Sequence, residues 1–244
     1  NGLVLNETKT QAIIFGTDDV GDNSLIHGET KIQFKDEVKL LGIIIDKDLS
    51  FISHVSSLVR RGGFKLHLVK RARKLLPRSL MTTVVHTTIL YPIVYAIQSW
   101  GPCLTGKSWG KLQVLQNHAA RSIFGASSFE HATPYREELG WIPIQQLALV
   151  KLYLLAFAAS NGKLGMLFKN FFHQMNHGYE TRGKSKHFLQ PFAEKFTRKG
   201  FAFTGPKLLN QVTDITQEEP QKLRHALLAK IRKGKLKLAL LSDT

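Results

Sequence analysis

Cysteine and acidic residues are both scarce in this chain of 244 residues. The single cysteine, Cys103, excludes an intramolecular disulfide and any zinc site built from several cysteine ligands. Asp and Glu number 18 against 34 Lys and Arg, which gives a net charge of +16. Because disulfides are absent from most proteins of reducing compartments, we expect an intracellular protein, in the nucleus or the cytoplasm.

The shortage of acids is confined to one part of the chain. Residues 1–50 hold five basic and nine acidic residues, a balance of −4, whereas residues 51–244 hold 29 and nine, a balance of +20. A surface this positive attracts polyanions, most simply nucleic acid. The alternative is a basic surface that keeps the protein soluble and has no ligand.

The chain also lacks the marks of export and of a membrane anchor. Its start has no basic-then-apolar signal pattern, and without an initiating Met we expect a piece of a longer reading frame. No charged residue lies between Arg78 and Lys107, which is long enough for a membrane span. Threonine, histidine and glutamine interrupt this stretch, and their side chains are costly in hydrocarbon. We therefore expect a buried helix pair and no membrane partner.

Motifs of catalysis are equally scarce. Residues 101–108 fit the pattern G-x-x-x-x-G-K-S of a phosphate-binding P-loop. Pro102, however, removes one of the N–H groups that would bind phosphate, and no acid follows in a position to hold Mg²⁺. His173 and His177 have the i, i+4 spacing of a metal pair but no Cys or Glu beside them. We predict a connector between two helices at residues 101–108 and no metal site.

Hydrophobic periodicity changes near Leu49. Before it, three runs have the composition of strands, namely residues 10–16, 30–34 and 38–46, with a Gly-, Asp- and Asn-rich gap at 16–28. After it, helical periodicity predicts helices at residues 50–76, 79–90, 107–124, 144–160, 164–175, 204–212 and 218–241. The run at 147–159 is apolar nearly all round and should be central, whereas 176–199 reads as a mobile basic loop. We expect an α+β fold that is mostly α.

The helix predicted at residues 50–76 is amphipathic. Its apolar stripe consists of Phe51, Val55, Leu58, Leu66, Val69 and Leu76. Between residues 60 and 78 there are eight basic residues and no acid, and Gly62 and Gly63 should weaken or bend the helix. The candidate nucleic-acid-binding residues are Arg60, Arg61, Lys65, Lys70, Arg71, Arg73 and Lys74.

Several segments, in this order, resemble the reverse transcriptases of non-LTR (LINE-type, jockey-like) retrotransposons. They are GLVLNETKTQAIIFG at 2–16, VKLLGIIIDKDLSFISHV at 38–55, RARKLLP at 71–77, a Trp-Gly pair at 100–101, LQNHAARSIFG at 115–125, ELGWIPI at 138–144 and GFAFTGPKLLNQV at 200–212. Leu209 stands where the family usually has tryptophan. The resemblance covers nearly the whole chain and places residues 101–108 in a variable connector.

The resemblance implies that the chain starts at the end of a polymerase palm. Asn6, Lys9 and Thr10 match the family's LN..KT segment, where Lys9 would lie near the incoming nucleotide and could serve as a general acid. Asp18-Asp19 lies downstream of this segment, so it is not the Asp-Asp pair that binds two Mg²⁺ ions. The isolated chain is therefore expected to be inactive and without a cofactor, with Mg²⁺ required only by the complete polymerase.

The resemblance also divides the chain into a palm segment at 1–48, a thumb-like helical domain at 49–125 and a basic helical extension at 126–244. Leu41, Gly42 and Ile43 match the primer-grip hairpin, where a glycine permits close approach of the primer end. The implied partners are RNA, DNA or an RNA–DNA hybrid, together with the upstream palm and fingers of the same polyprotein. Two alternatives are a stand-alone, non-catalytic nucleic-acid-binding protein derived from such an element and a P-loop NTPase.

Overall fold

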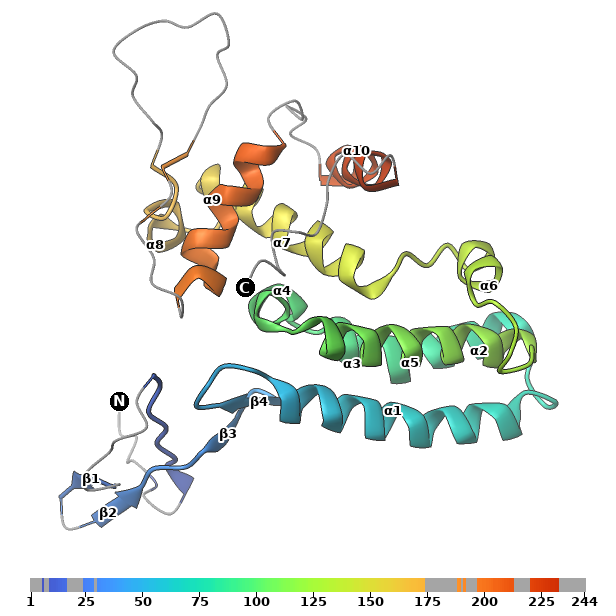
Figure 1. The fold of residues 1–244 in the computed structure, drawn as a ribbon, viewed down its shortest axis with the longest axis horizontal. Helices are drawn as coiled ribbons and strands as arrows, with labels where there is room; N and C mark the ends of the chain where they lie inside the picture. Colours follow the sequence, from blue (N-terminus) through green and yellow to red (C-terminus); the bar gives the residue numbers. More distant parts are fainter. Residues whose placement is uncertain are drawn as a thin grey trace, which may run out of the picture. The chain divides into compact units, whose positions relative to one another are not determined.

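The computed structural model describes residues 6, 9–16, 24–28, 30–173, 188–189, 191, 197–212 and 220–232. The chain forms two compact units, residues 1–57 and residues 58–244. All strands of the described residues lie in the first unit, and helices make up most of the second (Figure 1). The predicted α+β, mostly α fold is confirmed.

The first unit contains two antiparallel hairpins. β1 (Ser24–His27) pairs with β2 (Thr30–Gln33), and β3 (Glu37–Leu40) pairs with β4 (Ile43–Asp46). Both registers leave two residues in the connecting loop, the length that fixes the register of a tight hairpin. The small predicted sheet is thus present as two separate two-stranded sheets.

Three details of the predicted strands were wrong. Residues 10–16 form no strand, since their only ladder contact is an isolated bridge between Ala12 and Phe34. β1 lies in the Gly-, Asp- and Asn-rich gap, where we predicted no strand. Leu25 and Ile26 of β1 are both exposed, so this strand does not show the alternation of buried and exposed residues that reveals a strand in a sequence. The apolar run at 38–46 folds back on itself as β3 and β4, because Leu41 and Gly42 form a tight turn between them.

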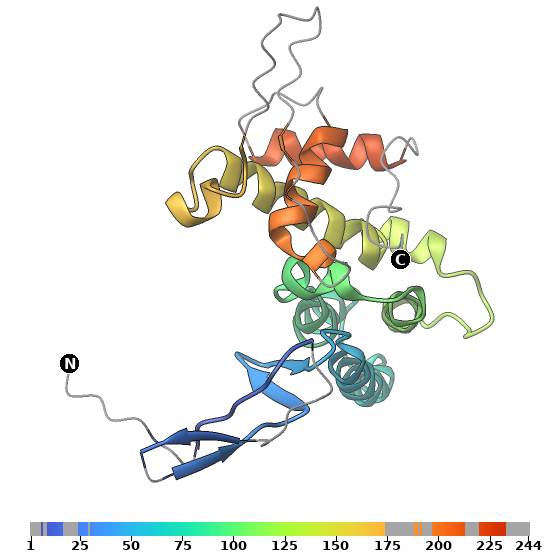
Figure 2. The ribbon, with the colours of Figure 1, turned by 60° about the vertical axis from the view of Figure 1, so that its left-hand side comes forward.

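The second unit begins within α1 and continues through a series of helices. α1 (Ile52–Ala72) runs without a break through Gly62 and Gly63. It is followed by α2 (Arg78–Val85), a π-helical turn (His86–Leu90), α3 (Tyr91–Val94), α4 (Ile97–Trp100), a 3₁₀ turn (Gly101–Cys103) and α5 (Gly106–Phe124). The helices α1, α2 and α5 run alongside one another in both views (Figures 1 and 2).

One stretch in the described part of the chain, Arg78–Cys103, is long and apolar enough to cross a membrane. Its backbone leaves the helical conformation at Tyr95 and Ala96, where Ala96 has φ 49°. The Trp100 Nε1–H donates to the Tyr95 carbonyl at 3.0 Å, which satisfies an oxygen freed by this break. Ile93, Ile97 and Trp100 are almost fully buried, but only 39% of the apolar window of this stretch is buried, so the absence of a membrane partner stays a prediction.

α7 (Ile144–Ser160) is the central helix of the remaining chain. The other elements are α6 (Thr133–Glu138), which packs on α5, α8 (Met166–Lys169), a 3₁₀ turn (Thr197–Lys199), which packs on α9, α9 (Phe201–Gln211) and α10 (Pro220–Arg232). α7 contacts α3, α4, α5, α8, α9 and α10, and its side chains form one core with those of α9 and α10. This confirms the prediction that the apolar run at 147–159 is central.

The helix predictions differ from the structure mainly at the ends. α1 stops at Ala72, so Leu76 lies beyond it, and the helix predicted at 164–175 is reduced to the four residues of α8. α3, α4 and α6 were not predicted, because helices of four to six residues show too little periodicity. Residues 174–187 and 233–244, with most of the predicted basic loop and the end of the tail, lie outside the described residues.

Candidate nucleic-acid interface

The buried face of α1 follows the predicted apolar stripe. Leu58, Leu66 and Val69 are at most 7% exposed. Gly62 lies between them and faces α5, where a Cβ added to it would come within 2.6 Å of a methyl group of Leu115. The absence of a side chain at Gly62 therefore sets how closely α1 approaches α5.

Four of the seven predicted cations lie on the outer side of α1 or just beyond its end. Arg60, Lys70, Arg71 and Lys74 are exposed. Their side chains make no hydrogen bond or ion pair with other described residues. The ion pairs seen between described residues, Lys47–Asp36 and Arg78–Glu138, involve none of them. These four charges are consequently available to an external anion.

Lys65 has an internal partner that the sequence did not predict. Its Nζ donates to the Thr88 carbonyl at 2.8 Å, and the side chain is partly buried. In a regular α-helix this carbonyl would accept from residue 92, but Pro92 has no N–H. Lys65 thus satisfies an oxygen at the π-helical turn and ties α1 to it, so we exclude it from the candidate phosphate contacts.

Arg73 packs against the end of α5. Its guanidinium occupies the space above Gly125, where an added Cβ would lie 1.0 Å from Nη1. Gly125 has φ 72° and ends α5, and the partial negative charge of a helix C-terminus attracts a cation. Arg73 is exposed nonetheless, and so is Arg61, the remaining candidate on α1.

The basic face of α1 continues onto α5 through a histidine. Burial together with the positive charges of Arg121 and Lys70 lowers the pKa of His118 below its ordinary value. Lys70 belongs to α1, and His118 and Arg121 belong to α5. The positive charges of Lys70 and Arg121 therefore both act on the imidazole of His118.

In the first unit, the three residues matched to a primer grip form the tip of the β3–β4 hairpin. Leu41 has φ 48° and Gly42 has φ 90°, the pair of positive angles that a two-residue type I′ turn requires. Leu41 is not glycine, so this conformation is strained, and its side chain is 81% exposed. Ile43, the first residue of β4, is half-buried.

This hairpin is fixed to the first turn of α1. Asp46 accepts hydrogen bonds from the backbone N–H groups of Ser50 at 2.9 Å and Phe51 at 2.6 Å. The Ile44 N–H donates to Nδ1 of His54 at 3.3 Å, and the Ser53 hydroxyl donates to Glu37. The tip at Leu41 and Gly42 is therefore held by both strands and by the start of α1.

Lys9 lies in a different setting from the one expected of a general acid. Its backbone N–H donates to the Asn6 carbonyl at 3.1 Å, which closes a single turn, and its side chain is exposed. Among the described residues, this side chain thus lies at the surface and not in an enclosed site. Its catalytic role remains a prediction, and Asp18-Asp19 lies outside the described residues.

Residues 101–105 connect α4 to α5, and residues 106–108 form the first turn of α5. The Thr105 hydroxyl accepts from the Ser108 N–H at 3.3 Å, which caps the start of α5. Ser108 is 5% exposed, and Gly101 lies against the ring of Trp109. A phosphate would find this helix start already capped and the serine buried, and a helix instead of a strand precedes it. The connector prediction is confirmed for residues 101–105 and wrong for residues 106–108, which are helical.

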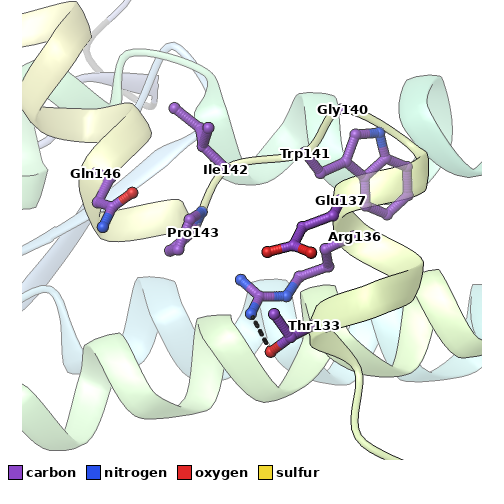
Figure 3. A pocket seen from close by; sticks show the side chains of 8 residues that line it. All are labelled: Thr133, Arg136, Glu137, Gly140, Trp141, Ile142, Pro143 and Gln146. Atoms are coloured by element: carbon purple, nitrogen blue, oxygen red, sulfur yellow. Dashed lines mark hydrogen bonds between the residues drawn. The ribbon is translucent and has the colours of Figure 1, made fainter. Parts of the chain in front are cut away.

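A cavity of about 510 Å³ lies between α6 and the start of α7 (Figure 3). Arg136 donates from Nη2 to the Thr133 hydroxyl at 3.1 Å, while its buried Nε–H has no hydrogen-bond partner in the described part of the chain. Glu137 and Gln146 also line the cavity. Both hydrogen-bond donors and acceptors therefore line this cavity, and no sequence motif indicated it.

The motifs of the family resemblance have structural roles around this cavity. Gly140 ends α6 with φ 67°, and Trp141 N–H donates to the Arg136 carbonyl at 2.7 Å, as in a Schellman motif. On α5, Gln116 donates to the Ile142 carbonyl at 2.9 Å and Gln113 accepts from the Ile144 N–H at 3.1 Å. These bonds fix the start of α7 to α5.

No metal site is visible in the described ranges, where no three His, Cys, Asp or Glu side chains come together. His173 is exposed, and His177, its proposed companion, lies outside those ranges.

Comparison with known proteins finds one relationship. No family model matches the chain, and no solved structure matches it. Over 116 residues, 45% of this chain, it is 30% identical to a probable RNA-directed DNA polymerase from transposon BS of Drosophila melanogaster. The match spans 12% of the length of that protein. The similarity supports a relationship between this chain and the RNA-directed DNA polymerases of retrotransposons.

Proposed function

We propose that this chain is the part of a retrotransposon polymerase that grips the template–primer duplex, and that the outer face of α1 contacts the phosphates. The observation that carries the proposal is the row of Arg60, Lys70, Arg71 and Lys74, exposed and without ion pairs among the described residues. α1 itself contains no acid. Phosphates are the ligands that such unneutralised cations bind best, whatever the base sequence.

The relationship to a transposon RNA-directed DNA polymerase supports this function over that of an unrelated basic protein. The non-LTR type and the correspondence with the palm end, primer grip and thumb belong to the proposal. So do the partners, which would be RNA, DNA or a hybrid, and the upstream palm and fingers. The hairpin tip at Leu41 and Gly42 would approach the primer end.

The test is the salt dependence of binding. The full chain is titrated with a DNA duplex and an RNA–DNA hybrid at several salt concentrations, as wild type and with Arg60, Lys70, Arg71 and Lys74 all replaced by Ala. For each cation that touches a phosphate, its removal should flatten the slope of log K against log salt by about 0.9 on duplex DNA. Affinity should fall to a similar degree for every sequence.

A matched control removes the same charge elsewhere. Lys35, Lys107, Lys163 and Lys169 are exposed and lie outside α1, so replacing all four by Ala lowers the net charge equally. If the two quadruple variants lose the same affinity and slope, only net charge matters and α1 is not the grip. If a folded α1 variant binds as wild type does, the proposal is wrong.

A further inference from the structure

Residues 127–130, which include Phe129, form a tight turn in the segment that connects α5 to α6 (Figure 1). The Glu130 N–H donates to the Ser127 carbonyl at 3.3 Å, and the Phe129 N–H donates to the Ser127 hydroxyl at 3.3 Å. The Phe129 side chain is 96% exposed, more than any other large apolar side chain in the described ranges. Single exposed apolar side chains are common on proteins, so exposure alone does not make this one functional.

The turn is braced from three sides, which separates it from an ordinary loop. One carboxylate oxygen of Glu130 accepts from the Ser127 N–H at 2.5 Å, and the other accepts from the Tyr135 hydroxyl of α6. The Glu130 carbonyl accepts from Nε of Arg121 on α5 at 2.7 Å. These bonds hold the backbone beneath Phe129, so little conformational freedom is left to lose when a ligand binds its ring.

Cations surround the end of α5 from which this turn leaves. Arg121 is part of the brace, and its hydrogen bond to Glu130 uses one of the five donors of a guanidinium. Arg73 lies over Gly125, and Arg78 lies over the ring of Phe124 at 4.5 Å. Phe129 thus precedes the residue whose carbonyl Arg121 holds, and the turn that carries it follows the helix end where Arg73 lies. Proteins bind unpaired nucleotides by combining exposed aromatic rings, which stack on the bases, with arginines, which contact the phosphates.

We propose that Phe129 is a stacking platform for an unpaired base, at a strand end or in a single-stranded extension, with Arg73 and Arg121 contacting the neighbouring phosphates. The inference rests on the proposed nucleic-acid-gripping function and adds to it a contact with an unpaired base at the C-terminal end of α5, beside Arg73. Because every base has an aromatic face, this contact is independent of sequence. Glu130 and Tyr135 act as positioning residues that hold the turn.

The experiment compares two probes on the full chain. One is a blunt DNA duplex, and the other is the same duplex with a short single-stranded extension whose first unpaired base is 2-aminopurine. Phe129→Ala should weaken binding of the extended probe by roughly 5-fold or more, since stacking of one base on an aromatic side chain is worth at least about 1 kcal/mol. It should leave binding of the blunt probe unchanged. Quenching of 2-aminopurine, the signature of stacking, should disappear with it.

Two further variants test the mechanism. Phe129→Trp keeps an aromatic face and should restore both affinity and quenching. Tyr135→Phe removes one brace and should reduce quenching by less than Phe129→Ala does. Repeating the measurement with an RNA extension shows whether the platform accepts ribonucleotides as well.

The outcomes separate this inference from the proposed function. If wild type binds both probes and Phe129→Ala changes neither, the stacking platform is refuted while the grip on α1 stands. Equal losses on blunt and extended probes would also refute it, because the contact would then not depend on an unpaired base. If wild type binds neither probe, the proposed function fails, and this inference fails with it.

Discussion

The two adjacent glycines of α1 should respond in opposite ways to the same substitution. Gly62 faces α5, and a Cβ there would lie 2.6 Å from Cδ2 and 3.1 Å from Cδ1 of Leu115. Gly63 is exposed, and a Cβ added there would meet nothing within 4 Å. Both positions lie in the same helix, and replacing glycine by alanine changes the entropy of the unfolded chain equally at each. The difference in unfolding free energy between the two variants therefore isolates the packing of α1 on α5.

The expected magnitudes follow from these distances. Alanine stabilises a helix interior relative to glycine by roughly 0.5–1 kcal/mol, so Gly63→Ala should raise the free energy of unfolding by that amount. Gly62→Ala gains the same but overfills a buried site, which costs typically about 1–3 kcal/mol. Leu115 is 4% exposed and has little room to move aside. We expect Gly62→Ala to be about 1–2 kcal/mol less stable than wild type.

Urea unfolding followed by circular dichroism measures both changes, and a second substitution checks their cause. Leu115→Ala removes the colliding methyl groups, so in that background Gly62→Ala should become neutral or stabilising. The coupling between the two sites should then reach about 2 kcal/mol. If Gly62→Ala stabilises the wild-type chain as much as Gly63→Ala does, α1 does not approach α5 as described.

Two further predictions concern pH. Burial raises the pKa of Tyr153, whose hydroxyl lies 3.5 Å from the Val212 carbonyl, to about 12. The stability tied to its proton is complete below the unfolded pKa near 10 and is lost as the pH rises towards 12, by about 3 kcal/mol. Urea titrations should show this loss in wild type but not in Tyr153→Phe, and equal losses in the two would contradict it. Burial, together with the charges of Arg121 and Lys70, lowers the pKa of His118. The neutral imidazole therefore contributes to the free energy of unfolding above about pH 6.5, and this contribution is lost as the pH falls through the lowered pKa. A phosphate bound at these cations adds negative charge and should raise the pKa of His118 again. Nucleic acid should therefore bind more tightly as the pH falls below about 6.5, and binding should take up protons. Calorimetry in two buffers counts the protons, and wild-type uptake no greater than that of His118→Gln would exclude phosphate binding there.

The sequence alone determined the long helices and the distribution of charge. The helices predicted at 107–124 and 144–160 agree with α5 and α7 to within a residue at each end. Their apolar positions repeat with the helical period over several turns. A glycine follows each helix, Gly125 after α5 and Gly162 after α7, and both glycines have a positive φ. The exposed cations of α1 follow equally from its sequence, because a helix that buries one stripe must expose the opposite one.

Tertiary structure alone decided which basic residues are already occupied and which short elements form. Nothing near Lys65 in the sequence reveals that its ammonium donates to the Thr88 carbonyl, which Pro92 cannot reach with an N–H. The position of Arg73 likewise depends on Gly125. The brace beneath Phe129 joins side chains of α5, the turn and α6, each of which is an ordinary polar residue in the sequence. Periodicity reports which face of a helix is buried, whereas the partner of a polar side chain is set by packing between segments distant in the chain.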